Sequence, residues 1–204
     1  MLKKVAISQY GVVDTAHPLY ITTVYRPGKH TPGQIRKLRE DLIKTVQVPF
    51  KFVVISDTQE DFKANEIIPL GLTEDQCPDK WRFMLAFKKE YEPNASVLYL
   101  DPSIQVRGSC MVLPCKDTEF CLARIDDKWD PRIMYFRNVT DIYQQFEEYV
   151  TNPRQTPLDY LYSDPASYLI SDMLYSDKVI RDVLFHVDYE KSPSQNDLFN
   201  FVVA

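Results

Sequence analysis

The segment SVLYLD, which runs from Ser96 to Asp101, decides the fold because it is an apolar run that stops at a carboxylate. Two similar runs lie upstream, YITTVY at residues 20–25 and FKFVVIS at residues 50–56. β-Branched and aromatic residues favour strands, and runs without polar alternation are typical of strands that are covered on both faces. The sequence therefore predicts three buried strands.

The segments between these runs have the apolar spacing of helices. Residues 32–46 place Ile35, Leu38 and Leu42 on one helical face, and residues 80–91 show a similar pattern. The order strand, helix, strand, helix, strand predicts a parallel sheet with right-handed crossovers. We therefore expect an α/β fold, a mostly parallel sheet flanked by helices, as a single domain over residues 1–204. Further strands are expected at 67–70, 120–123 and 133–136, and further helices at 140–150, 166–175 and 177–184.

Polar residues follow each of the three expected strands. Tyr25 and Arg26 end the first strand, Ser56 and Asp57 end the second, and Asp101 ends the third. Parallel sheets bind ligands in the crevice beyond the carboxyl ends of their strands. If the three strands are neighbours, these side chains lie along one edge of the sheet and form a candidate ligand site.

Composition excludes several classes of function. The formal net charge is -5 and no long run of lysine or arginine occurs, which disfavours nucleic acid as a partner. No stretch is apolar enough to span a membrane, and the first residues lack the apolar segment of a signal peptide, so we expect a cytoplasmic protein. The four cysteines form no C-x-x-C pair, which argues against a zinc site.

Several short motifs occur in an order that is found in one enzyme family. They are YITTVY at 20–25, FKFVVISD at 50–57, KWR at 80–82, VLYLD at 97–101, YSDPASYL at 162–169 and FH at 185–186 followed by KSP at 191–193. Together they span residues 20–193. In order and spacing the chain resembles small GT-A-type glycosyltransferases, such as the glycogenin-like enzymes, whose fold is a Rossmann-like sheet flanked by helices.

The resemblance implies transfer of a sugar from a UDP-sugar or another nucleotide sugar to an acceptor. The acceptor could be a glycan, a protein or a modified nucleobase. In the family, a D-x-D motif and a C-terminal histidine hold Mn²⁺ or Mg²⁺ on the diphosphate. The corresponding positions here are Asp101, Ser103 and His186, so the second carboxylate of the motif is missing.

The resemblance also implies roles for other residues. Tyr25, Arg26 and Asp57 would hold the nucleotide. Lys80, Arg82 and Lys191 would neutralise the diphosphate, either beside a metal ion or in its place, since charge develops on the leaving group. Asp101 and Asp164 are the expected catalytic residues, with Asp164 facing the sugar or the acceptor.

Three alternatives stay open at this point. The missing carboxylate is consistent with a catalytically silent protein that binds a nucleotide sugar or a protein partner. A phage-type enzyme that glycosylates modified DNA bases would suit the small size, although the acidic charge argues against it. A nucleotidyltransferase ranks lower, because the chain has only five glycines and no glycine-rich loop after its first strand.

Overall fold

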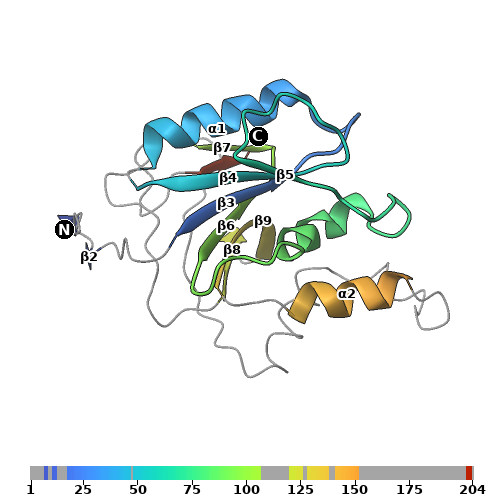
Figure 1. Cartoon of the computed structure of the whole chain (residues 1–204). Helices are drawn as coiled ribbons and strands as arrows, with labels where there is room; N and C mark the ends of the chain where they lie inside the picture. The colour runs from blue at the N-terminus through green and yellow to red at the C-terminus, as the bar shows by residue number, and fades with distance from the viewer. Residues whose placement is uncertain are drawn as a thin grey trace.

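A six-stranded mixed sheet forms the centre of the protein (Figure 1). The computed structural model describes residues 7–8, 11–12, 18–46, 48–106, 120–125, 128–137, 141–151 and 201–203. In sheet order the strands are β5 (Glu66–Ile68), β4 (Phe50–Ile55), β3 (Leu19–Val24), β6 (Ser96–Leu100), β9 (Lys128–Phe136) and β8 (Phe120–Ile125). The first four run parallel, whereas β9 pairs antiparallel with both β6 and β8.

The three strands expected from the apolar runs are β3, β4 and β6, and they lie side by side. Leu19 of β3 is paired with Phe50 on one side and with Ser96 on the other. Every residue of β3 and of β6 is buried, which explains why neither shows polar alternation. The expected mostly parallel α/β sheet flanked by helices is confirmed, with β9 and β8 as an antiparallel extension.

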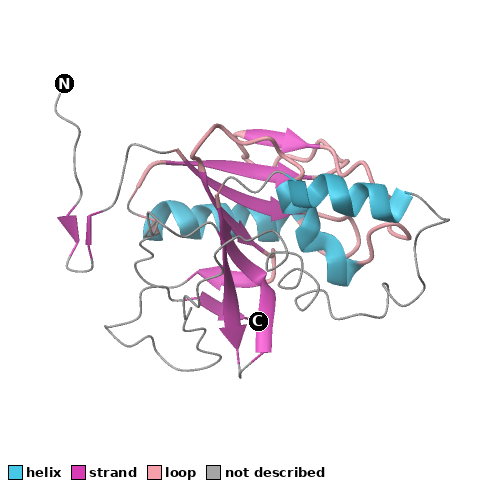
Figure 2. Ribbon diagram, turned by 90° about the horizontal axis from the view of Figure 1, so that it is seen from below, coloured by secondary structure: helices cyan, strands magenta, loops and turns pink. Residues whose placement is uncertain are grey.

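Helix α1 (Pro32–Thr45) covers one face of the sheet (Figures 1 and 2). Its start is fixed by a capping box, in which the Gln34 N–H donates to Thr31 Oγ1 at 3.2 Å and the Thr31 N–H donates to Gln34 Oε1 at 2.7 Å. Its buried residues are Ile35, Leu38 and Leu42, which pack against side chains of β3, β4 and β6. The expected helix at residues 32–46 is confirmed.

The opposite face is covered by η1 (Asp79–Phe87) and α2 (Asp141–Thr151), as Figures 1 and 2 show. The helix expected at residues 80–91 is present but shorter, because η1 is a 3₁₀ helix that ends at Phe87, and every residue from Trp81 to Phe87 is buried. Trp81 stacks on Phe146 of α2, and Phe87 packs against Phe136 of β9. The helix lies between two layers, and its first two residues, Asp79 and Lys80, are the ones that reach solvent.

The remaining described elements are short. Strand β7 (Ile104–Val106) pairs antiparallel with β10 (Phe201–Val203) and packs on the α1 side of the sheet, and β1 (Ile7–Ser8) pairs with β2 (Gly11–Val12). The helices expected at residues 166–175 and 177–184 lie outside the described residues. Within the described part of the chain, no helix has the length and apolar character needed to cross a membrane.

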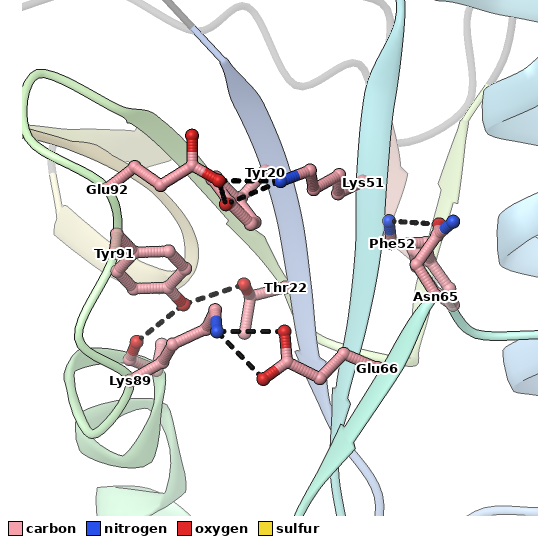
Figure 3. Close-up of polar contacts among 10 residues, drawn as sticks. Tyr20, Thr22, Lys51, Phe52, Asn65, Glu66, Lys89, Tyr91 and Glu92 are labelled. Atoms are coloured by element: carbon pink, nitrogen blue, oxygen red, sulfur yellow. Dashed lines mark hydrogen bonds and ion pairs between the residues drawn. The ribbon is translucent and has the colours of Figure 1, made fainter.

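A polar network joins β3 and β4 to the segment that follows η1 (Figure 3). Tyr20 Oη and Lys51 Nζ both donate to Glu92 Oε1, at 2.7 and 2.6 Å. Tyr91 Oη donates to the carbonyl of Ala86 at 3.0 Å and lies 2.8 Å from Thr22 Oγ1, so the Thr22 hydroxyl is the donor in that contact. These groups satisfy one another, which makes the network a structural brace and not a ligand site.

Tyr91→Phe tests this brace. The substitution leaves the buried Thr22 hydroxyl and the Ala86 carbonyl without their partner, so we expect a loss of about 1–3 kcal/mol in the free energy of unfolding. Urea unfolding measures the loss. Tyr143→Phe is the matched control, because its hydroxyl bonds only the partly exposed Glu147 at 2.9 Å, and it is expected to cost less. An unchanged unfolding midpoint for Tyr91→Phe would contradict the structural role.

Candidate functional site

The carboxyl edge of the parallel strands holds a buried group of charged side chains. Arg26 follows β3 and Asp101 follows the neighbouring strand β6, so the sheet register places both at the same edge. Arg82, on η1, reaches the same place, with its Nη2 3.4 Å from Asp101 Oδ2. The exposed fractions are 6% for Arg26, 6% for Arg82 and 8% for Asp101. Charged groups this deeply buried require partners.

Asp79 lies among the cations. Its Oδ1 is 3.6 Å from Arg82 Nη1 and 3.9 Å from Arg26 Nη1, and its Oδ2 is 3.0 Å from Lys29 Nζ. We call Arg26, Lys29 and Arg82 the cation cluster. The ion pairs that the described residues give these three cations are with two carboxylates, those of Asp79 and Asp101, so these five groups together carry a net charge of +1. Glu74 adds negative charge near Lys29.

Hydrogen bonding in the cation cluster is incomplete. All three guanidinium nitrogens of Arg26, the Nε and Nη1 of Arg82 and the Nε2 of His30 are buried and have no hydrogen-bond partner among the described residues. Each buried donor left without an acceptor costs free energy, so native structures rarely keep several together unless a ligand or water completes them. The unmatched donors and the excess charge both favour an oxygen-rich anion.

The environment of Asp101 disfavours a divalent metal ion. Its Oδ1 accepts hydrogen bonds from the Ser103 N–H at 2.9 Å and from Ser103 Oγ at 2.7 Å, while Oδ2 faces Arg82. Mg²⁺ and Mn²⁺ need several free oxygen ligands, and an adjacent guanidinium repels them. The described residues contain no group of three His, Cys, Asp or Glu side chains that could hold a metal. They therefore do not fit the metal implied by the D-x-D resemblance; His186 lies outside the described residues.

Other predicted site residues make contacts of a different kind. Tyr25 packs against Phe62, with ring centroids 4.8 Å apart, in the core on the α1 side of the sheet. Asp57 is exposed, and its Oδ1 accepts the backbone N–H of Leu70 at 2.8 Å, which fixes the loop after β5. Lys80 is exposed on η1. Two of the other predicted residues, Asp164 and Lys191, lie outside the described part of the chain.

Sequence analysis assigned no role to Asp79 or His30, which the structure brings to the site. Neither belongs to a motif, because Asp79 directly precedes the KWR segment and His30 lies in a polar loop. A usable signal for His30 was its position four residues after Arg26, within one turn of the end of the same strand.

Comparison with known proteins places the fold. No protein-family model and no curated protein sequence matches the chain. Among solved structures, the apo-form glycosyltransferase GlyE of Streptococcus pneumoniae TIGR4 matches with a TM-score of 0.53 and 10% identity, over 81% of this chain and 45% of that chain. The chain therefore shares its fold with part of the GlyE chain.

A second structure of GlyE from the same organism gives a TM-score of 0.52 at 14% identity, over 82% of this chain and 45% of that one. The chain thus spans less than half the length of the GlyE chains. At this level of identity the likeness establishes the fold, and the activity has to be argued from the site.

Asp79→Asn tests the charge balance of the site. Burial alone would raise the pKa of Asp79, but its hydrogen bond to Lys29 and the charges of Arg82 and Arg26 lower it overall. Because the folded-state pKa lies below the unfolded value, the carboxylate stabilises the fold above the unfolded pKa, and this contribution is lost as the pH falls through the folded value. At neutral pH we expect the variant to lose up to about 1 kcal/mol, since the side chain is 38% exposed.

Urea unfolding across the acid range measures this effect. The difference between wild type and Asp79→Asn is expected to shrink as the pH falls below about 4, the unfolded pKa of an aspartate, and to vanish only below the lowered folded-state pKa of Asp79. Asp41→Asn is the matched control, because Asp41 pairs only with Lys37 on the surface of α1. A difference that persists at low pH would show that the Asp79 charge does not stabilise the site.

Proposed function

We propose that this chain transfers a glycosyl group from a nucleotide sugar, and that Arg26 and Arg82 bind the diphosphate of the donor. The observation that carries the proposal is the set of buried guanidinium N–H groups without acceptors, at the edge where parallel sheets bind ligands. The glycosyltransferase fold of the chain agrees with it.

A diphosphate suits these donors better than a neutral sugar or a base does. Guanidinium groups present a planar fork of N–H donors that matches phosphate oxygens, often with two hydrogen bonds to one group. Arg26 and Arg82 together hold five nitrogens that lack a hydrogen-bond partner among the described residues, three on Arg26 and two on Arg82. A diphosphate supplies enough oxygens for all of them, and its negative charge compensates the excess positive charge of the cation cluster.

The same residues support the chemical step. When the sugar leaves, negative charge grows on the departing nucleoside diphosphate, and fixed cations stabilise that charge without having to reorganise. We propose that Arg26 and Arg82 carry out this role in place of the divalent metal of the D-x-D enzymes. Lys80 and Lys191 were predicted to assist, and Lys80 is close in sequence to Arg82 on η1.

Asp101 acts in this proposal as a positioning residue. Ser103 fixes one of its carboxylate oxygens, and the other lies 3.4 Å from Arg82 Nη2, so the pair sets where the Arg82 guanidinium points. Asp164 keeps its predicted role toward the sugar or acceptor. UDP is the nucleotide expected from the resemblance. The expected acceptor is one of three classes: a glycan, a protein or a modified nucleobase.

Calorimetric titration with UDP-glucose in the presence of EDTA tests the proposal. We expect wild type to bind, and Arg26→Gln to weaken binding about 10- to 100-fold, because a hydrogen bond to a charged group contributes about 1.5–3 kcal/mol. Arg82→Gln is expected to act in the same direction. Lys37→Gln is the matched control for loss of a cation, since Lys37 pairs with Asp41 on the outer side of α1.

Thermal unfolding of each variant separates lost contacts from lost folding. Arg26 is the better probe, because the ion pair that the described residues give it, with Asp79 at 3.9 Å, is weak. Without it, Asp79 still pairs with Lys29 and Arg82. ADP-, GDP- and dTDP-glucose extend the titration to other bases. If none of the four binds, or if folded Arg26→Gln binds as wild type does, the proposal fails. Binding with no release of nucleoside diphosphate on incubation with acceptors would favour the catalytically silent alternative.

A further inference from the structure

His30 is held against the cation cluster by a turn at the end of β3. The backbone N–H groups of Lys29 and His30 donate to the carbonyl of Arg26, at 3.3 and 3.2 Å. Gly28 permits the turn, because its φ of 83° is strained for residues with a side chain. The turn therefore fixes the backbone of His30 beside that of Arg26, and the imidazole feels the charges of Arg82, Asp101 and Asp79.

The imidazole is half-buried, and its Nε2 is buried without a hydrogen-bond partner among the described residues. This atom is unmatched in the same region as the guanidinium nitrogens of Arg26 and Arg82. A buried ring nitrogen is normally paired, so we expect a ligand or a water molecule to complete it.

The charges around His30 come from three elements. Arg26 and Lys29 lie on its own turn, Asp79 and Arg82 on η1, and Asp101 at the end of β6. Burial lowers the pKa of His30 first, and the positive charge of Arg82 lowers it further, against the opposing effects of Asp101 and Asp79. In the free protein the ring is therefore neutral at neutral pH, in a place that carries excess positive charge.

We propose that His30 binds the same diphosphate as Arg26 and Arg82 and takes up a proton from solvent when that anion arrives. This inference rests on the proposed function and goes beyond it. A neutral imidazole has a single N–H, whereas the protonated ring donates from both nitrogens. Phosphate oxygens near Nε2 favour the protonated form of the ring, because their negative charge offsets the effect of Arg82, which lowers the pKa of His30 in the free protein. The proton returns to solvent when the nucleoside diphosphate leaves.

Proton uptake couples donor affinity to pH. The bound-state pKa of His30 lies above the free-state value, so binding is strongest below the free-state pKa and weakens as the pH rises through the bound-state pKa. Between the two values the affinity changes by up to about tenfold per pH unit, the limit for one proton. A site made only of arginines and a lysine would show no such dependence near neutrality.

Calorimetry in buffers of different ionisation enthalpy measures the proton directly. UDP-glucose is the first probe, in EDTA, because a diphosphate esterified at both ends has no group of its own that titrates near neutral pH. For wild type we expect uptake approaching about one proton per site, and affinity that falls between about pH 6 and about pH 8. His30→Gln, whose amide can donate a hydrogen bond but cannot titrate there, is expected to bind with no proton uptake and flat affinity.

Lys37→Gln is the control and is expected to keep wild-type proton uptake. Binding of UDP-glucose by wild type without proton uptake, or the same uptake in wild type and His30→Gln, overturns the role of His30 and leaves the proposed function standing. Absence of binding to UDP-glucose and to ADP-, GDP- and dTDP-glucose overturns both. These two failures are therefore distinguished within one set of titrations.

Discussion

The site depends on one imbalance: two guanidinium groups are buried where the described side chains cannot satisfy them. Arg26 and Arg82 are each 6% exposed, yet Asp79 reaches them only at 3.9 and 3.6 Å and leaves most of their nitrogens without hydrogen bonds. Such burial is costly unless an anion completes it. Asp101, Ser103 and His30 lie around these two guanidinium groups, so their proposed roles depend on this imbalance.

The order of the strands brings these charged groups together at one edge of the sheet. Adjacent parallel strands β3 and β6 bring Arg26 and Asp101 to one edge, and the buried helix η1 adds Asp79 and Arg82 from the layer beneath. Because Ser103 fills the position of the second D-x-D carboxylate and bonds Asp101, the edge carries less negative charge than a metal site needs. In the proposed site, a hydroxyl in place of that carboxylate thus favours binding of an anion over binding of a metal cation.

Much of the fold could be predicted from the sequence, because β3, β4 and β6 are largely apolar runs without polar alternation and α1 has Ile35, Leu38 and Leu42 at helical spacing. The 3₁₀ type of η1 could not be predicted, since a helix that is buried from Trp81 to Phe87 has no polar face to define its period. Strand ends pointed to Arg26 and Asp101, and the motif resemblance to Arg82. The part played by Asp79 depends on contacts between distant segments, which no local pattern encodes, whereas the position of His30 follows from the turn that begins at Arg26.

A crystal structure of the protein soaked with UDP in the presence of EDTA tests the central claim most directly. The account predicts a diphosphate whose oxygens lie within hydrogen-bonding distance of the guanidinium groups of both Arg26 and Arg82, with the Asp101–Ser103 contacts unchanged. The account is contradicted if UDP binds away from these arginines. It is also contradicted if UDP binds only after Mn²⁺ is added, with the metal on Asp101.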